Sequence, residues 1–233
     1  MIAKLENAFA SQKRFNSSVA HELKTPLAVI KTNIDVLKSS NCKSLEEYDK
    51  TLEVVEKSIL KMNLIIETLL DIIRQENAPL NEIVSIDEIL EDIVDDLSII
   101  ANKKNIKLKL NSYNIKNKIK GNEIMLYRAF YNVIENSIKY NKINGSIDIL
   151  CYQDLNTIEV KVIDTGSGIK EEDYDEIFKP FYRCEGINSH SKNGVGLGLS
   201  LTQSVIKLHG GEIKVKSKLN EGTEFTFILP YIV

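Results

Sequence analysis

The sequence predicts two kinds of domain in series, a long helical hairpin followed by an α/β sandwich. Apolar residues recur with helical spacing through the first third of the chain, and a capping sequence divides that third into two helices. After Pro79, strand-like alternating segments are mixed with helical ones. The 233 residues are enough for two small domains, each with its own core. We therefore predict the class α + α/β.

The composition is that of an ordinary soluble protein. The hydrophobic fraction is 43%, the charged fraction is 27%, and the net charge is -3 with opposite charges interspersed. This balance gives no electrostatic argument for binding nucleic acid or a membrane surface. The three cysteines lie far apart without disulfide or metal spacing, which is typical of a reducing cytosol. The longest apolar stretch, 64–73, is interrupted by Glu67 and Asp71, so we expect no transmembrane helix.

Two helices are predicted in the first part of the chain. The first covers about 3–38. Ser44-Leu-Glu-Glu47 then has the form of a capping box that begins the second helix. One hairpin cannot cover two wide apolar stripes, so we predict that two copies pair into a four-helix bundle. Packing of the hairpin onto the chain's own second domain is the alternative. The second helix has a heptad repeat at Leu52, Val55, Ile59, Met62, Ile66, Leu69 and Ile73.

His21 lies on the outer side of the first helix. At about 100° per residue it lies roughly 160° from the apolar line, and Thr25 is on the same outer side one turn later. With Glu22 beside it, this histidine can be reached by another group. For a lone His-Glu pair, a surface histidine without a role is the more economical interpretation. The apolar line consists of Val19, Leu23, Leu27, Ile30, Ile34 and Leu37.

The domain boundaries are predicted at 1–77 for the hairpin, 78–84 for a linker, and 85–233 for the second domain. Ser85-Ile-Asp-Glu88 has the form of another capping box. The second domain is predicted to be a mixed, largely antiparallel sheet with helices on one face. The expected helices are 86–104, 123–140 and 196–209, and the expected strands are 106–110, 146–152, 157–163, 212–217 and 223–229.

Two glycine motifs follow or precede regular elements. Asp164-Thr-Gly-Ser-Gly-Ile169 follows a strand, where Asp164 can accept a hydrogen bond from an exocyclic amine and the glycines allow a tight turn. Gly194-Val-Gly-Leu-Gly-Leu199 opens a helix, whose backbone N–H groups suit phosphate. Either motif alone is weak, because DxGxG also occurs in ordinary turns and the second motif lacks dinucleotide-fold spacing.

Polar side chains share one face of the 123–140 helix. Asn132, Asn136 and Lys139 are spaced by four and three, with Tyr140 at the end. Such a stripe suits Mg²⁺ together with phosphate oxygens, and one Asn oxygen can suffice as the direct protein ligand. A solvated polar face is the alternative.

A polar, glycine-containing stretch, 184–194, has the composition of a mobile lid. Arg183, which ends Phe178-Lys-Pro-Phe-Tyr-Arg183, could meet a terminal phosphate; a surface loop explains the segment equally well. After Arg183 the basic groups of the lid are only His190 and Lys192; Lys192 is the candidate for phosphate contact, and His190 is interpreted as a residue without a role in the site. His209 lies at a helix end, where a basic side chain suits the macrodipole.

Taken in order, these motifs resemble those of the sensor histidine kinases of two-component systems. HELKTP resembles the H box, NVIENSIKY the N box, and DTGSGI, FKPFYR, GVGLGL and GTEF the G1, F, G2 and G3 boxes. The match covers nearly the whole chain. It implies a GHKL ATP-binding fold for the second domain. Gyrase and mismatch-repair ATPases share that fold but lack the H box.

The resemblance implies roles at the phosphoacceptor helix. His21 would be the phosphoacceptor through Nε2, and Glu22 would accept the Nδ1 proton. Thr25 matches the position that orients a water for dephosphorylating the partner. Arg183 would stabilise charge on the transferring group, and Pro26 should bend the helix after the site.

The resemblance also implies binding of ATP and Mg²⁺. Asn136 would ligate Mg²⁺, with Asn132 close by and Lys139 near the phosphates. Asp164 would bind the adenine amino group. The other residues that the resemblance places in the nucleotide site are Tyr140, Gly166, Gly168, Ile169, Gly194, Gly196, Leu197, Gly198 and Thr223.

The expected function is ATP-dependent autophosphorylation on His21 and transfer to an aspartate of a response regulator, with phosphatase activity toward that regulator. The expected partners are a second copy of the chain and a receiver domain, without nucleic acid or membrane contact by this segment. We expect a cytoplasmic segment of a protein anchored in the bacterial membrane. A GHKL-type ATPase without phosphotransfer and an inactive dimeric scaffold remain the alternatives.

Overall fold

The computed structural model describes residues 2–39, 44–76, 79–113, 115, 117–184 and 195–231, with side chains except in 2–14 and 71–76. Contacts divide the chain into a helical unit that ends at Ile73 and an α/β unit that begins at Arg74. No helix in these ranges has an apolar stretch long enough to cross a bilayer.

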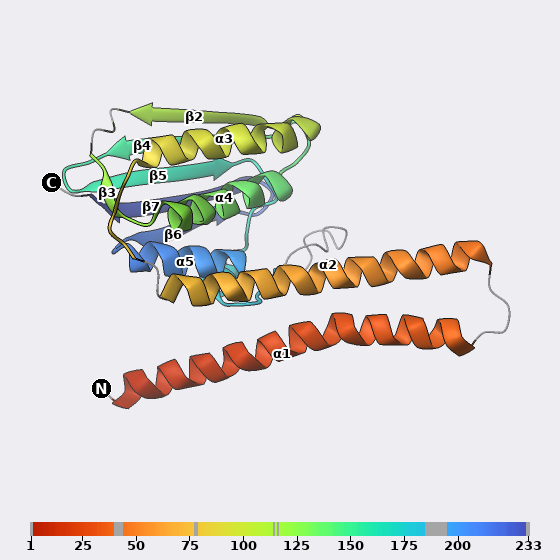
Figure 1. Cartoon of the computed structure of the whole chain (residues 1–233). Helices are drawn as coiled ribbons and strands as arrows, with labels where there is room; N and C mark the ends of the chain where they lie inside the picture. The colour runs from red at the N-terminus through yellow and green to blue at the C-terminus, as the bar shows by residue number, and fades with distance from the viewer. Residues whose placement is uncertain are drawn as a thin grey trace. The chain divides into compact units, whose positions relative to one another are not determined.

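The helical unit consists of α1 (Ile2–Ser39) and α2 (Leu45–Glu76). The predicted capping box begins α2 as expected: the Ser44 N–H donates to Glu47 Oε2 at 3.1 Å, and the Glu47 N–H donates to Ser44 Oγ at 3.3 Å. Pro26 lies inside α1. Because proline removes one backbone donor, a bend is expected there, and α1 is visibly bent along its length (Figure 1).

The apolar stripes of both helices are covered only in part. On α2, one of the two apolar positions of the heptad is exposed to solvent. Its residues are Leu52, Ile59 and Ile66, which are 62%, 47% and 43% exposed. On α1, Leu27 and Ile34 are exposed in the same way, whereas the rest of the predicted apolar line is half-buried. The chain therefore presents an unpaired apolar face, defined here as Leu27, Ile34, Leu52, Ile59 and Ile66.

The α/β unit is a five-stranded sheet with its three α-helices on one face (Figure 1). The strand order is β2-β4-β5-β7-β6; β2 and β4 are parallel and the other pairs are antiparallel. The predicted architecture is thus confirmed. The elements are α3 (Ile86–Lys103), β2 (Lys107–Tyr113), α4 (Glu123–Lys139), β4 (Ser146–Gln153), β5 (Thr157–Asp164), α5 (Gly198–Leu208), β6 (Glu212–Lys218) and β7 (Gly222–Pro230).

The core lies between the helices and the covered face of the sheet. Along β5 the side chains of Ile158, Val160 and Val162 are fully buried, and the intervening ones are half-buried. Phe130 of α4 meets Phe227 of β7 edge to face, with ring centroids 4.9 Å apart. Burial of each such large side chain contributes about 1.5–3 kcal/mol. This packing fixes α4, the helix on which the polar stripe was predicted.

Several local features differ from the prediction. Residues 82–84, assigned to the linker, form β1 (Glu82–Val84), which pairs antiparallel with β3 (Ile119–Gly121). Such short strands leave no periodic signal in the sequence. The predicted box at Ser85 is not formed: Ser85 is the N-cap of α3, but its hydroxyl accepts no backbone N–H and donates to Asp87 Oδ1 at 2.7 Å. The 3₁₀ turns η1 (Glu171–Asp173) and η2 (Glu176–Phe178) were not predicted.

Candidate functional site

Helix α4 carries the predicted polar stripe of the nucleotide site. It begins at the N-cap Asn122, whose Oδ1 accepts the Met125 N–H at 3.1 Å. Asn132, Asn136 and Lys139 are half-buried along it, while the opposite face packs in the core. At its end, Lys139 Nζ lies 5.3 Å from the centroid of the Tyr140 ring.

Asp164 ends β5 and is almost buried, with 9% of its surface exposed. Its Oδ1 accepts the N–H groups of Gly166 at 2.8 Å and Thr223 at 3.2 Å, and its Oδ2 accepts the Ser137 hydroxyl at 3.1 Å. Burial raises the pKa of Asp164, against the opposing effect of these hydrogen bonds. A carboxylate has about four acceptor positions, so one remains on Oδ2. That position can accept an N–H from an amino group.

The DTGSGI turn lies close to the end of α4 and to the β6–β7 turn. The Ser167 N–H donates to the Tyr140 carbonyl at 3.1 Å, and a Cβ on Gly166 would lie 2.8 Å from the same oxygen. Gly168 has φ +68°, and its Cβ would lie 2.1 Å from the Lys218 carbonyl. Gly166 therefore requires glycine for space, and Gly168 requires it for both conformation and space.

A cluster of hydroxyls joins the DTGSGI turn to GTEF. The Ile169 N–H donates to Ser217 Oγ at 2.8 Å, and that hydroxyl donates to the Gly222 carbonyl at 2.7 Å. The Thr223 hydroxyl, 2.9 Å from Ser217 Oγ, must then be the donor in that pair. Ile169 is half-buried against the core, and Thr223 is buried. The side chains of these two predicted site residues are therefore engaged within the protein.

The segments on either side of residues 185–194 meet in the structure. The Phe181 N–H donates to the Gly196 carbonyl at 2.7 Å. Gly196 has φ +76°, and its Cβ would lie 2.7 Å from the Tyr182 carbonyl. Arg183 is exposed beside this junction. The predicted Gly194 and the lid candidate Lys192 lie outside the described residues, as does His190.

Helix α5 packs closely against α4 at its first residue. A Cβ on Gly198 would lie 2.0 Å from Asn132 Oδ1, and Asn132 Nδ2 donates to Thr202 Oγ1 at 3.1 Å. Asn132 thus bonds α4 to α5 through Thr202, and Gly198 leaves the space that the Asn132 side chain occupies. Leu197 is buried, and within the described chain no side chain caps the helix at this residue. The first N–H groups of α5 are therefore suited to an anion.

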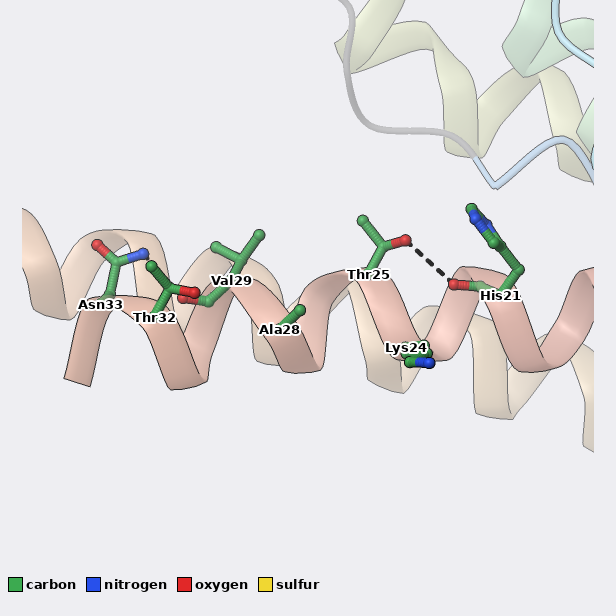
Figure 2. A pocket seen from close by; sticks show the side chains of 7 residues that line it. All are labelled: His21, Lys24, Thr25, Ala28, Val29, Thr32 and Asn33. Atoms are coloured by element: carbon green, nitrogen blue, oxygen red, sulfur yellow. Dashed lines mark hydrogen bonds between the residues drawn. The ribbon is translucent and has the colours of Figure 1, made fainter. Parts of the chain in front are cut away.

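His21 is exposed on α1, as predicted. A groove of about 430 Å³ runs beside it along the helix, and the Thr25 hydroxyl donates to the His21 carbonyl at 3.1 Å (Figure 2). The side chains between its two ends, Thr25, Ala28 and Val29, are small, which leaves room next to the imidazole. They are His21, Lys24, Thr25, Ala28, Val29, Thr32 and Asn33.

Glu22 is turned toward α2. Its Oε2 lies 3.2 Å from Nζ of Lys61, with 29% of the Glu22 side chain and 35% of the Lys61 side chain exposed. Consecutive residues on a helix do not face each other, so Glu22 points away from the direction of His21. Acceptance of the His21 proton by Glu22 stays a prediction that requires this ion pair to open.

The prediction for His209 as a cation at a helix end is wrong. The ring is buried, its Nε2 accepts the Asn122 N–H at 3.0 Å, and its Nδ1 lies 2.8 Å from the Val205 carbonyl. An acceptor at Nε2 and a donor at Nδ1 define the neutral tautomer. Burial lowers the pKa of His209, in agreement with this geometry. His209 therefore links the end of α5 to the start of α4.

The interpretation of the sequence missed three hydroxyl side chains: Ser137 and Thr202, which are buried, and Ser217, which is half-buried. Ser137 and Thr202 occupy positions within apolar helix stripes, and both are almost fully buried. A hydroxyl at a core-facing position needs a partner. That is the signal by which the first two could have been found, but the identity of the partner depends on the fold.

Both halves of the chain match known families. Residues 11–78 match the family described as His Kinase A (phospho-acceptor) domain, and residues 121–232 match the Histidine kinase-, DNA gyrase B-, and HSP90-like ATPase family. The two matches occur in the order expected from the motifs. The chain belongs to the sensor histidine kinases. Its second domain is accordingly an ATP-binding domain of the GHKL type.

Individual histidine kinases share this organisation. The signal transduction histidine-protein kinase ArlS of Staphylococcus aureus (strain USA300) is 31% identical over 98% of this chain and 51% of its own length. The chain thus spans about half the length of the curated relatives it matches. The mycobacterial sensor histidine kinase MprB is 26% identical, with a TM-score of 0.55 over 65% of this chain and 97% of its own. The histidine kinase ThkA in complex with response regulator protein TrrA has the same fold, with a TM-score of 0.71 over 98% of this chain and 66% of its own at 21% identity.

Proposed function

We propose that this chain uses ATP to phosphorylate His21 and then passes the phosphoryl group to an aspartate of a response regulator. One observation carries the proposal: an exposed imidazole lies beside a groove on α1, in the same chain as a buried carboxylate, Asp164, that keeps one acceptor position open. The first can receive a phosphoryl group, and the second can hold the purine that delivers it.

The α/β unit supplies the groups that bind the nucleotide. Asp164 accepts an N–H from the adenine amino group. Tyr140, which is 36% exposed, lies beside the DTGSGI turn. Lys139 and the N-terminus of α5 supply positive charge and N–H donors for the phosphates. Arg183 is the exposed cation next to the lid segment.

Mg²⁺ fits the donor set of α4. Among the described residues no cluster of three His, Cys, Asp or Glu side chains could enclose a metal ion. A half-buried amide oxygen on Asn136 is instead the kind of single ligand that suits Mg²⁺, which keeps several waters and shares phosphate oxygens. When bound, the ion would neutralise charge on the phosphates during transfer.

The transfer itself is a substitution at the γ-phosphorus. Nε2 of neutral His21 forms the N–P bond as the bond to the ADP oxygen breaks, and the Nδ1 proton passes to Glu22. For this, Glu22 must turn from Lys61, 3.2 Å away in the structure, toward His21. The imidazole itself is already exposed, so the step requires no rearrangement of the core.

The groove beside His21 is the proposed contact for a receiver domain. It leaves the imidazole open to an incoming carboxylate, and Thr25 lies on the same side one turn later. The proposed phosphatase role of Thr25 is to orient a water toward the phosphorylated partner. The ThkA structure of similar fold, solved with a response regulator, supports this class of partner.

The unpaired apolar face of the helical unit supports a homodimer. Its members are 39–62% exposed and follow seven-residue spacing on each helix. A second copy of the same hairpin can cover such a stripe by forming a four-helix bundle. We also propose that the hairpin is a domain of residues 1–77, that 78–84 link it to the domain 85–233, and that the whole protein is anchored in the bacterial membrane with this segment in the cytoplasm.

Incubation with γ-labelled ATP and Mg²⁺ tests the proposal. A protein label that is stable to base, lost in acid and absent from His21→Gln is the expected result. Free phosphate without protein label would support an ATPase instead. Neither signal would support a scaffold. The variant removes an exposed ring, so its unfolding curve should match that of the wild type.

A further inference from the structure

Lys104, in the turn after α3, reaches the last turn of α4. Its Nζ donates to the carbonyls of Ile138 at 3.0 Å and Lys139 at 2.8 Å, and its side chain is half-buried. The last carbonyls of a helix lack partners within the helix and carry partial negative charge. A lysine ammonium satisfies both needs, so Lys104 is a cap supplied by another element.

The end of α4 lacks the more common glycine cap. Its C-cap, Tyr140, has φ -95°, and the following residue is Asn141 rather than a left-handed glycine. A second bond to Ile138, from the Asn141 N–H, is long at 3.4 Å. The two shorter bonds from Lys104 therefore hold this turn from one side.

The DTGSGI turn contacts the next residue along the chain, Tyr140. The Tyr140 carbonyl accepts the Ser167 N–H at 3.1 Å, and Gly166 must be glycine because a Cβ would lie 2.8 Å from that carbonyl. The last turn of α4 is thus held between Lys104 and the DTGSGI turn. Lys139, whose carbonyl Lys104 binds, places its own ammonium over the Tyr140 ring at 5.3 Å.

We infer that Lys104 is a positioning residue for the nucleotide: it fixes the backbone of the last turn of α4, from which Asn136, Lys139 and Tyr140 project. The inference rests on the proposed function, because it assigns these three residues to the ATP site. Lys104 acts through the carbonyls of Ile138 and Lys139 and takes no part in phosphoryl transfer.

The test compares Lys104→Met, Lys104→Arg and the control Lys103→Met in the full chain. Lys103 is the neighbouring lysine, carries the same charge and is exposed. Calorimetry measures the affinity for Mg·ADP, and labelling rates at increasing ATP give KM and kcat. We expect Lys104→Met to weaken Mg·ADP binding and raise KM about tenfold, the effect of losing hydrogen bonds from a charged donor, with kcat within about twofold. Lys104→Arg should recover most of the affinity, and Lys103→Met should bind as the wild type does.

Four results would overturn the inference. A lower kcat with unchanged KM would mean that Lys104→Met only reduces the folded fraction. An equal loss in Lys103→Met would mean that general charge, rather than the cap, matters. Wild-type binding by Lys104→Met would remove the inference alone and leave the proposed function standing. A wild-type chain that binds no Mg·ADP would remove both.

Discussion

The two parts of the proposed site are built in opposite ways. Asp164 is 9% exposed and accepts hydrogen bonds from α4, from its own turn and from β7. His21 is exposed on a single helix. The Thr25 hydroxyl donates to the backbone carbonyl of His21 and not to its ring. The carboxylate of Asp164 is thus fixed by hydrogen bonds within the protein, whereas the ring of His21, the proposed phosphoacceptor, is accessible.

The contrast follows from what each part must do. A buried carboxylate can recognise an amine only if its remaining acceptor position is fixed, and preorganised dipoles avoid reorganisation when the ligand binds. An imidazole that receives a phosphoryl group from ATP and gives it to a second protein must be reachable by both. Substitutions at closely packed glycines beside Asp164 should therefore affect folding strongly, whereas substitutions around His21 should hardly affect it.

The largest structural effect is expected for Gly222→Ala. Gly222 has φ +139°, and a Cβ would lie 1.9 Å from the carbonyl of Asp164. Backbone strain and overpacking together should destabilise the α/β unit by about 4 kcal/mol. Urea unfolding monitored by circular dichroism measures this change.

Gly210→Ala is the matched control for that substitution. Gly210 also has positive φ, +73°, but the nearest atom to its Cβ would be Pro230 Cγ at an ordinary 3.4 Å. Only the conformational cost of about 1–2 kcal/mol should appear. Equal losses in the two variants would show that close packing against Asp164 is unimportant.

Asp164→Asn should separate binding from stability. The amide oxygen can replace Oδ1 opposite the N–H groups of Gly166 and Thr223, and the Ser137 hydroxyl can turn to accept from the amide NH₂. The NH₂ group then faces the adenine amine, so affinity for Mg·ADP should fall about 100-fold, or about 2.7 kcal/mol.

The stability of Asp164→Asn should stay within about 1 kcal/mol of the wild type at pH 7. The pKa of Asp164 in the folded protein is raised above its usual 3.8. The contribution of this group to the folding free energy therefore becomes less favourable as the pH rises from 3.8 through the pKa of the folded state. At pH 7 the wild type therefore carries the unfavourable burial of a charge that asparagine lacks. Unchanged affinity in calorimetry would contradict the role of Asp164.

His209 should give a smaller effect that depends on pH. Its pKa in the folded protein is lowered from 6.5, so as pH falls the unfolded chain takes up the proton first. The contribution of the neutral ring is complete above about pH 6.5 and is lost below it. Between pH 7 and pH 5 the wild type should lose about 1 kcal/mol more stability than His209→Gln. Parallel stability curves would show that the ring does not titrate in this way.

Thr25→Ala should have the smallest structural effect. Thr25 is exposed and makes its bond within α1, so unfolding free energy should change by less than about 0.5 kcal/mol. Its functional effect should fall on dephosphorylation of a phosphorylated receiver domain more than on autophosphorylation. Timed assays of both reactions measure the difference, and equal losses would reject this division of roles.

The sequence predicted the features that repeat or form a motif. The heptad of α2, the capping box at Ser44 and the alternation of β5 are local patterns, and each appears in the structure. The order of the motifs also allowed the family to be named before the fold was known. The sequence could not show which distant segments contact one another. Several of the hydrogen bonds around Asp164 form at such contacts.

Lys104, His209 and Ser137 illustrate what was missed. Each side chain binds a partner more than 20 positions away in the chain, at Ile138, Asn122 and Asp164 respectively. For His209 the local environment, a helix end, pointed to a cation, but burial in the tertiary structure decided for the neutral ring.

Mapping the phosphorylated residue tests the central claim most directly. The full chain is incubated with ATP and Mg²⁺ and digested at alkaline pH, and the phosphopeptide is sequenced by mass spectrometry. The account predicts one phosphoryl group on His21, introduced about fiftyfold more slowly after Asp164→Asn at an ATP concentration near the wild-type KM. A phosphoryl group on another residue, or undiminished labelling of His21 in that variant, would contradict it.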